Sequence, residues 1–272
     1  MDKLTAQQVE FFETFGYLVL PGLLAQEIDW ITHEFESVFT DKGVVHDFWQ
    51  RTCVVPFIDS RERLSTLLDH PKVEGLAASL IGDDFDYVGS DGNYYTGDTS
   101  WHSDGFHTVG CFIKIALYLD PVRRESGALR VIPGSHRVDL HDSWAARRAR
   151  NSVELWGIEQ RDVPAISLDS NPGDVVAFNH NLMHAAFGGS NQRRMFTLNC
   201  CRRCKTKEEI QDLESYIGGH DRFLNDHMHS DQMKSTASPS RMRHLEQVLA
   251  HEGHLASLAA KARETLAEPA RG

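Results

Sequence analysis

Apolar residues recur every three or four positions in two segments near the N-terminus, which is the spacing of one face of an α-helix. This pattern predicts a first helix from Leu4 to Tyr17, with Thr5 as its cap and Gly16 at its end. A short apolar strand is predicted at Tyr17 to Leu20, and a second helix at about Ala25 to Phe39. We expect both helices to support a sheet.

The periodicity changes after a further helical segment. Residues Leu64 to Leu80, interrupted by Pro71, predict a broken pair of helices that ends near Gly82. Beyond it, alternating or short apolar runs separated by Gly, Pro, Asn and Asp predict strands at Phe85–Val88, Cys111–Leu119, Ala128–Ile132, Asp174–Phe178 and Arg194–Cys200. Such a series is typical of a closed or double-sheet β architecture.

Two segments fall outside this β pattern. The insert from Arg137 to Ser170 is too long for a simple hairpin, and segments of that length are commonly lids or substrate loops. From Glu208 the chain becomes helical and polar, with Ser240 as the cap of a helix through Leu266. We therefore expect one domain over residues 1–272, with N-terminal helices at about 4–80, a β core at about 83–205 and a helical C-terminal extension at about 206–268.

Composition adds few restrictions. The chain is 41% hydrophobic and 25% charged, which is usual for a globular protein, and its net charge of −11 disfavours nucleic acid as a partner. The sequence contains no apolar run of about 18 residues and no signal-peptide pattern, so we expect a cytoplasmic protein with no membrane partner. The cysteines are odd in number and sparse, which predicts reduced thiols: Cys53, Cys111, Cys200, Cys201 and Cys204.

The strongest chemical signal is a His-x-Asp pair. On an extended strand, His102 and Asp104 project to the same face about 6 to 7 Å apart, which suits two neighbouring metal ligands. About 80 residues downstream, the turn at 171–174 and the strand after it lead to His184, with His180 as an alternative on the same loop. Two histidines and one carboxylate form the facial triad that leaves open positions on Fe(II).

Other polar residues are candidates for the same cavity. Arg193 and Arg194 begin a strand, so alternation points one of them inward, where a dicarboxylate would satisfy its guanidinium. Lys114 lies within an apolar run, and either contacts an anionic group or extends its ammonium to solvent at a sheet edge. Asn93 and Thr99 belong to the polar stretch before the His-x-Asp pair and are expected to line the cavity.

Three further groups are interpreted as structural. Gly134-Ser135-His136 follows a strand and is expected to form a turn. The histidines His220, His227 and His229 have no neighbouring carboxylate pattern and are expected to be exposed. No spacing argument places Trp49, Gln50 and Arg51 at the site, although an N-terminal segment could close over it.

The combined motifs resemble the phytanoyl-CoA dioxygenase family of Fe(II)/2-oxoglutarate-dependent oxygenases over roughly residues 10–205. The matching pieces are Trp101-His-Ser-Asp104, the stretch from Ser126 to His136, Pro172-Gly-Asp174, His184 and Arg193. The resemblance implies an all-β core with flanking helices, folded as a double-stranded β-helix, or jelly roll. It also implies His102, Asp104 and His184 as iron ligands.

The same resemblance implies Arg193 as the partner of the distal carboxylate of 2-oxoglutarate. Lys114, Asn93 and Thr99 are further candidate contacts because of their positions in the sequence. Related iron halogenases carry a small residue in place of the aspartate, so Asp104 favours hydroxylation. The expected cofactor and cosubstrates are Fe(II), 2-oxoglutarate and molecular oxygen.

The expected reaction is therefore hydroxylation of a C–H bond of a small polar metabolite, with release of succinate and carbon dioxide. The alternative is a non-oxidative or non-catalytic jelly-roll metal protein that binds a small metabolite. Members of the resembled family accept acyl-CoA thioesters, amino acid derivatives, quaternary amines and organophosphonates. Because the protein is acidic and shows no basic groove for coenzyme A, we favour a small polar or zwitterionic substrate, with a small organophosphonate as one specific hypothesis.

Overall fold

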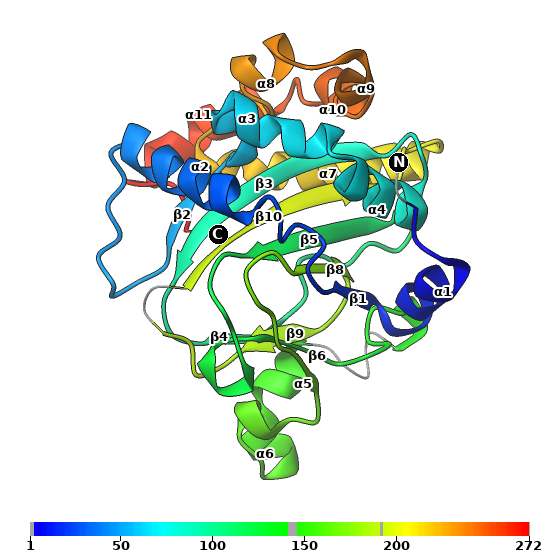
Figure 1. The fold of residues 1–272 in the computed structure, drawn as a ribbon, viewed down its shortest axis with the longest axis vertical. Helices are drawn as coiled ribbons and strands as arrows, with labels where there is room; N and C mark the ends of the chain where they lie inside the picture. Colours follow the sequence, from blue (N-terminus) through cyan, green and yellow to red (C-terminus); the bar gives the residue numbers. More distant parts are fainter. Residues whose placement is uncertain (1–2, 141–145, 191–192, 272) are drawn as a thin grey trace.

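The computed structural model describes residues 3–140, 146–190 and 193–271, and its centre is a pair of facing antiparallel sheets (Figure 1). Within the described residues, the larger sheet has the strand order β1-β8-β5-β10-β3-β2 and the smaller one β4-β9-β6-β7. The strands are β1 (Tyr17–Leu20), β2 (Thr52–Val54), β3 (Asp86–Tyr95), β4 (Thr99–His102), β5 (Phe112–Tyr118), β6 (Leu129–Val131), β7 (Ile166–Leu168), β8 (Val175–Asn179), β9 (His184–Ala186) and β10 (Arg193–Cys201).

Helices surround the sheets. They are α1 (Ala6–Phe15), α2 (Ile28–Asp41), α3 (Glu62–Ser65), α4 (Pro71–Ile81), α5 (Ala146–Arg150), α6 (Ser152–Trp156), α7 (Lys207–Gly218), α8 (Asp231–Ser235), α9 (Pro239–Arg243), α10 (Glu246–His251) and α11 (Leu255–Thr265). Short 3-10 turns are η1 (Ile58–Ser60), η2 (Thr66–Asp69), η3 (Arg124–Ser126), η5 (Gln160–Asp162) and η6 (Gly219–Phe223). Two antiparallel sheets with helices outside them are the double-stranded β-helix expected from the sequence.

The N-terminal helices begin and end where their sequence signals lie. Thr5 and Gln8 form a reciprocal capping box at the start of α1, and Gly16 ends the helix with a φ of 82°. Pro71 starts α4 as its first residue, which divides the predicted pair of helices. Helix α2 begins three residues later than expected, at Ile28.

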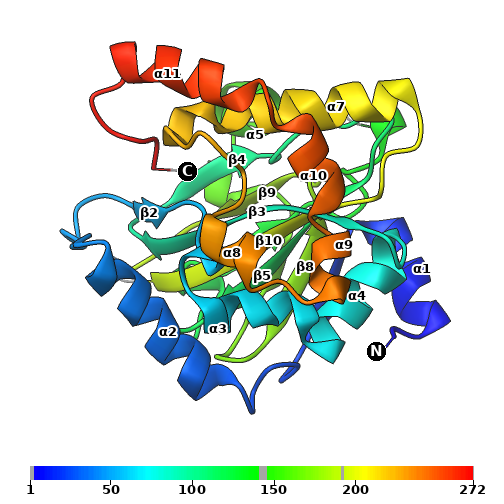
Figure 2. The same cartoon turned by 90° about the horizontal axis from the view of Figure 1, so that it is seen from above.

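The larger sheet buries its two faces against different partners. Ile113, Ile115 and Leu117 of β5 point to the outer face, where α2, α3 and α4 cover the sheet (Figures 1 and 2). The intervening residues, including Ala116 and Tyr118, point inward toward the smaller sheet. The period of two in the sequence therefore separates a helix-covered face from the interior between the sheets.

The C-terminal extension differs from the prediction of one helix from Ser240 through Leu266, which is wrong. Ser238 is the cap, Pro239 follows it as the first helical residue, and the segment forms α9, α10 and α11 in succession. A serine followed by proline starts a helix more effectively than a serine two residues later, because the proline occupies a position that needs no N–H. Helices α7, α10 and α11 pack against Val88 of β3 and Phe112 of β5 through Leu213, Val248 and Leu255.

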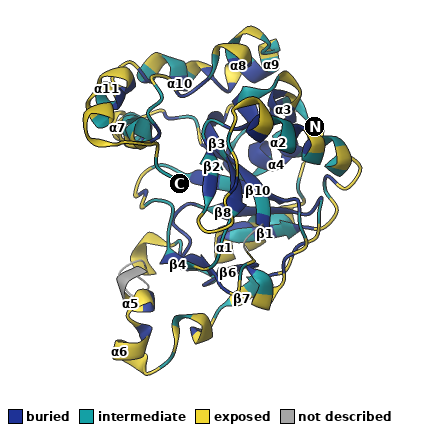
Figure 3. Ribbon diagram, turned by 90° about the vertical axis from the view of Figure 1, so that its left-hand side faces the viewer, coloured by how far each residue is buried: buried dark blue, intermediate teal, exposed yellow. Residues whose placement is uncertain are grey.

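The insert from Arg137 to Ser170 carries α5, α6, η5 and β7, and its residues 141–145 lie outside the described part of the chain. Figure 3 shows α5 and α6 as largely exposed elements at one end of the molecule. Among the described residues, no helix is both long enough and apolar enough to cross a membrane. The five cysteines are free, as expected.

Candidate functional site

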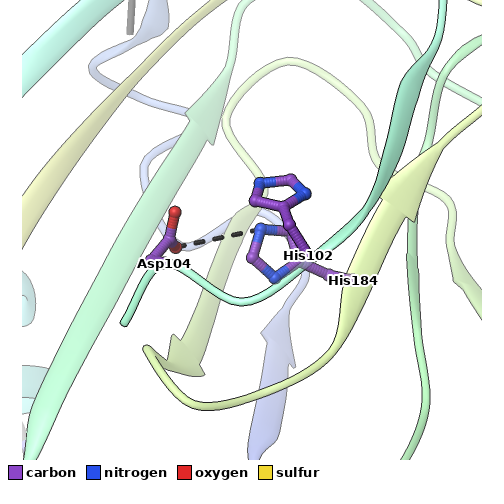
Figure 4. A group of neighbouring side chains, drawn as sticks. All are labelled: His102, Asp104 and His184. Atoms are coloured by element: carbon purple, nitrogen blue, oxygen red, sulfur yellow. Dashed lines mark ion pairs between the residues drawn. The ribbon is translucent and has the colours of Figure 1, made fainter. Parts of the chain in front are cut away.

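Pairing between β4 and β9 brings two of the predicted ligands together. His102 and His184 are direct partners across the two antiparallel strands, and Asp104 follows two residues after His102. One ligand atom of each of these three residues lies within 4.8 Å of the others. In Figure 4 the three side chains converge, with Asp104 facing His184. The structure thus assembles the His-x-Asp…His group that the sequence predicted.

Backbone carbonyls orient both imidazoles. The Nδ1 of His102 lies 2.8 Å from the Ser100 carbonyl, and the Nδ1 of His184 lies 2.8 Å from the Leu182 carbonyl. Because a carbonyl oxygen only accepts, each Nδ1 carries the proton and each Nε2 is left with a lone pair. Burial lowers the pKa of His102 below its ordinary value and that of His184 to about 3, so both rings are neutral at physiological pH.

Asp104 divides its two oxygens between different neighbours. Its Oδ1 lies 2.9 Å from the Lys114 ammonium, whereas its buried Oδ2 has no hydrogen-bond partner and lies 3.8 Å from the His184 Nε2. Burial acts to raise the pKa of Asp104, but Lys114 and the facing histidines hold it well below its ordinary value. The carboxylate is therefore ionised, with one oxygen free to bind a cation.

Lys114 lies on β5, which is inside the larger sheet, so the sheet-edge interpretation is wrong. Its side chain is 16% exposed and points inward beside Ala116 and Tyr118. Burial acts to lower the pKa of Lys114, while Asp104 and Asp91 raise it above its ordinary value. Lys114 is thus a buried cation that forms an ion pair with Asp104 and is further stabilised by the charge of Asp91.

His180, the alternative ligand, lies in the same cavity but outside the three-residue group. Its Nε2 lies 3.2 Å from the Asn199 side-chain oxygen, and its Nδ1 is buried without a partner. Because the amide oxygen accepts, Nε2 carries the proton and the ring presents no free Nε2 lone pair to Asp104. The hydrogen bond to Asn199 favours His184 as the ligand.

The cavity has a volume of about 560 Å³ and extends from the histidines to Arg193 at the start of β10. Arg193 is 3% exposed, and its Nε and Nη1 atoms are buried without a hydrogen-bond partner. Its guanidinium lies beside Gly127 and Gly189, where an added Cβ would come within 1.6 Å and 2.6 Å of Nη1. Two glycines therefore make the space for an arginine that forms no ion pair with any described carboxylate.

The neighbouring arginine points the other way. Arg194 donates to the Asp120 carboxylate at 2.6 Å and to Glu36 at 2.7 Å on the helix-covered side of the sheet. These hydrogen bonds raise the pKa of Arg194 above its ordinary value. Strand alternation thus leaves Arg193 as the inward residue of the pair.

The other two predicted contacts are placed differently. Thr99 lines the cavity at the start of β4. Asn93 is fully buried, and its amide is used by the side chains of Arg51, at 2.9 Å, and Asp91, at 2.6 Å. Asn93 does not line the cavity. Its contact with 2-oxoglutarate therefore stays a prediction that the geometry does not support.

Sequence reasoning missed several residues of the cavity wall. They come from β3 and the helical extension: Asp91, Tyr216, His220, Arg222 and Phe223. The segment just before β2 adds Arg51, which no spacing argument had placed at the site. The expectation that His220 and His229 are exposed is wrong, because His220 lines the cavity and His229 is 1% exposed, whereas His227 is exposed as expected. Tyr216 and His220 are four residues apart, and this helical spacing was the one available signal for a shared face.

The side chains fit a divalent cation and a dicarboxylate. Two neutral imidazoles and one carboxylate, with a free oxygen on Asp104, are the donor set that non-haem Fe(II) oxygenases use. Arg193 offers two unpartnered N–H groups in the same cavity, each of which can donate to a carboxylate oxygen. Both fits depend on buried polar atoms that lack a protein partner.

Comparisons with known proteins agree with this arrangement. The family model described as phytanoyl-CoA dioxygenase (PhyH) matches residues 12–196. No curated protein is significantly similar to the chain in sequence. Among solved structures, HygX from Streptomyces hygroscopicus with nickel and 2-oxoglutarate bound has a TM-score of 0.58 at 18% identity, covering 76% of this chain and 90% of that one.

Two other solved structures are similar to the same degree. EctD from S. alaskensis with bound Fe has a TM-score of 0.57 at 21% identity and covers 73% of this chain and 77% of its own. The non-heme alpha-ketoglutarate-dependent carbocyclase SnoK from nogalamycin biosynthesis has a TM-score of 0.55 at 21% identity, with 73% and 84% covered. At these identities the structural likeness establishes the fold.

Proposed function

The chain belongs to the phytanoyl-CoA dioxygenase family of Fe(II)/2-oxoglutarate-dependent oxygenases, and from this premise we propose that it hydroxylates a C–H bond of a small polar metabolite. In this reaction one atom of molecular oxygen enters the C–H bond. The other enters 2-oxoglutarate, which is released as succinate and carbon dioxide.

The observation that carries the proposal is Arg193, a buried arginine whose Nε and Nη1 have no partner. A buried guanidinium without an anion is costly, which supports a carboxylate as the ligand of this arginine. Arg193 shares one cavity with Asp104 and the two histidines. A ligand with an acid at each end, such as 2-oxoglutarate, satisfies both ends of that cavity. A non-oxidative metal protein, the alternative function, would have no need for this arginine.

The metal ligands and Lys114 would have different roles in this reaction. His102 and His184 would hold the metal through Nε2, and Asp104 through Oδ2, the atoms that carry no proton and no protein partner. When bound, Fe(II) with 2-oxoglutarate supplies the oxidising chemistry that a protein side chain lacks. Lys114 keeps Asp104 ionised and fixes its orientation.

Arg193 orients the cosubstrate, and the apolar side chains of Leu129, Phe178 and Met195 limit the water beside it. A cavity of about 560 Å³ suits a small substrate in addition to the cosubstrate. We also propose that the chain acts as one catalytic unit. In support, the N-terminal helices pack on the outer face of the larger sheet, and the C-terminal helices contribute to the cavity wall.

The test is an anaerobic titration of the metal-free protein with Fe(II) and 2-oxoglutarate, followed by a succinate-release assay in air with a panel of small polar metabolites. We expect the weak visible charge-transfer band of the chelate and Fe(II)-dependent succinate release that at least one substrate increases. Absence of both the band and any Fe(II)-dependent consumption of 2-oxoglutarate would refute the proposal.

A further inference from the structure

The cavity continues past the predicted ligands to a second group of cations, at its mouth. Arg222 of η6 lines this part of the cavity, and its guanidinium carbon lies 4.7 Å above the ring of Phe223. Among the described residues, none forms an ion pair with Arg222. The arginine is therefore held against an aromatic ring with its charge still available.

Arg51, from the N-terminal part of the chain, also lines this cavity. Its guanidinium carbon lies 4.3 Å from the ring centroid of Tyr95, and that of Arg193 lies 5.0 Å from the same centroid. Because β2 and β10 flank β3 on opposite sides, the two arginines reach Tyr95 from opposite sides. Tyr95 thus separates the Arg193 end of the cavity from a second cationic region.

The C-terminal segment connects the two parts of the second region through one main-chain and one side-chain hydrogen bond. The Ala270 amide donates to the Arg222 carbonyl at 2.9 Å, and the Arg271 guanidinium donates to the Arg51 carbonyl at 3.4 Å. Consecutive residues therefore connect the backbones that carry the two arginines.

The charges of the cavity wall are unbalanced. Its cations are Arg51, Lys114, Arg150, Arg193 and Arg222, and its anions are Asp91 and Asp104. Lys114 neutralises Asp104, and Arg51 lies 3.4 Å from Asp91, so the two acids are already paired. Positive charge remains at Arg150 and Arg222 even when 2-oxoglutarate occupies Arg193. This excess lies in a protein of net charge −11, so it is local to the cavity.

The hydroxyl of Tyr216 adds a neutral donor to this region. Tyr216 lines the cavity from α7, and no described residue shares a hydrogen bond with its hydroxyl. Burial raises its pKa well above the ordinary value, so the group stays protonated and can donate. Cationic N–H groups and a free O–H facing one space are the donors that recognise an oxyanion.

We propose that Arg222, together with the Tyr216 hydroxyl, binds a carboxylate or phosphonate group of the primary substrate. This inference rests on the proposed function and assigns the substrate class, a small organic anion. Lys114, which the sequence suggested as a contact for an anionic group, is excluded from it because it is bound to Asp104, and Arg51 is excluded because it is paired with Asp91. The anionic group is held at the cavity mouth, and the rest of the substrate extends toward the metal ligands.

The test uses the full-length protein loaded with Ni(II), which does not support turnover, and saturated with 2-oxoglutarate so that Arg193 is occupied. Binding of methylphosphonate, acetate and tetramethylammonium is then measured by calorimetry. We expect one or both anions to bind and the cation not to bind. Arg222→Gln should weaken anion binding about tenfold or more, Arg222→Lys should retain part of it, and Tyr216→Phe should cause a smaller loss.

Arg202→Gln is the matched control, because Arg202 is exposed, lies outside the cavity and carries the same charge. It should leave anion binding unchanged, which separates a local contact from the overall field. Three outcomes would overturn the inference: anion binding only when 2-oxoglutarate is left out, equal binding by the Arg222→Gln variant, or preferential binding of tetramethylammonium. Failure of the protein to bind Ni(II) and 2-oxoglutarate in the same titration would instead refute the proposed function.

Discussion

The ammonium of Lys114 binds one oxygen of Asp104, at 2.9 Å, and leaves the other oxygen facing His184. Lys114 therefore orients the carboxylate but also places a positive charge beside the position of the metal. Two unit charges 4 Å apart interact by about 4 kcal/mol at an effective dielectric constant of 20. The repulsion should outweigh the gain in orientation.

For the Lys114→Met variant we predict a lower melting temperature of the metal-free protein, because Asp104 loses its counter-ion. The increase in melting temperature on adding Ni(II) should be larger than in the wild type. Thermal unfolding with and without the metal measures both effects. A smaller metal-induced increase would show that Lys114 is needed to position the ligand.

His184 and His180 provide a matched pair for the metal site. His184→Ala should lower metal affinity at least a hundredfold and abolish succinate release, because its free Nε2 faces Asp104 Oδ2 at 3.8 Å. His180→Ala should bind the metal nearly as well as the wild type, since its Nε2 is used by Asn199. Equilibrium dialysis with Fe(II) under anaerobic conditions distinguishes them. The reverse order would assign the ligand to His180.

Substitution of Arg193 should weaken cosubstrate binding, whereas substitution of Arg194 should lower stability. Arg193→Gln should raise the dissociation constant of 2-oxoglutarate at least tenfold with little change in stability, because the wild-type guanidinium has no protein anion to lose. Arg194→Gln should lower the melting temperature, since Asp120 and Glu36 lose their partner, and should leave 2-oxoglutarate binding intact. Calorimetry and thermal unfolding of both variants test this division.

Substitution of Gly127 provides a second, independent test of where Arg193 lies. Its φ is +89°, and an added Cβ would come within 1.6 Å of the Arg193 Nη1. Gly127→Ala should therefore displace the guanidinium and raise the KM for 2-oxoglutarate while metal affinity stays near that of the wild type. Gly157→Ala is the control, because its φ is also positive, at +68°, but nothing lies within 4 Å of the added atom. Equal KM values in the two variants would contradict the placement of Arg193.

Asp86 predicts a pH dependence of stability that is separate from the site. Burial raises its pKa to about 7, and Arg203 opposes this from 3.3 Å. The unfolded chain ionises this group near pH 4, so between about pH 4 and pH 7 the folded state binds more protons and stability falls as pH rises. Below pH 4 Asp86 is protonated in both the folded and the unfolded chain, so the folded protein carries no buried charge at this position and its stability no longer changes with the titration of Asp86.

Asp86→Asn removes this titration. We expect the melting temperature of the variant, relative to the wild type, to rise by several degrees between pH 5 and pH 8, since about 1 kcal/mol corresponds to about 2–4 °C in a chain of this size. Parallel melting curves across that range provide the measurement. A difference that is constant with pH would mean that Asp86 is ionised in the folded protein.

The sequence predicted those parts of the fold in which several consecutive residues repeat one pattern. Strands β5, β8 and β10 were found because their inward and outward residues alternate over five or more positions. Strands β2, β7 and β9 have three residues each and were not predicted, whereas the equally short β6 was found because it lies in the longer apolar run Ala128–Ile132. Their existence depends on pairing with distant strands.

The candidate site, too, was predictable from the sequence only in part. His102 and Asp104 were predictable as a pair from their His-x-Asp spacing, although β4 ends at His102 and Asp104 lies in the bend after it. The inward orientation of Arg193 depends on the register of β10 against β3, which pairs it with Tyr95. Arg51 and Arg222 could not be associated from the sequence, since only the folded chain brings β2 and η6 to one cavity.

The family match ends at residue 196, whereas Tyr216 and Arg222 follow it in the helical extension. The metal ligands and Arg193 thus lie within the matched residues, and Tyr216 and Arg222 lie in a segment that follows them. If Arg222 holds the substrate as proposed, exchange of α7 and η6 for the corresponding segment of another protein is a route to altered substrate preference that keeps the metal ligands in place.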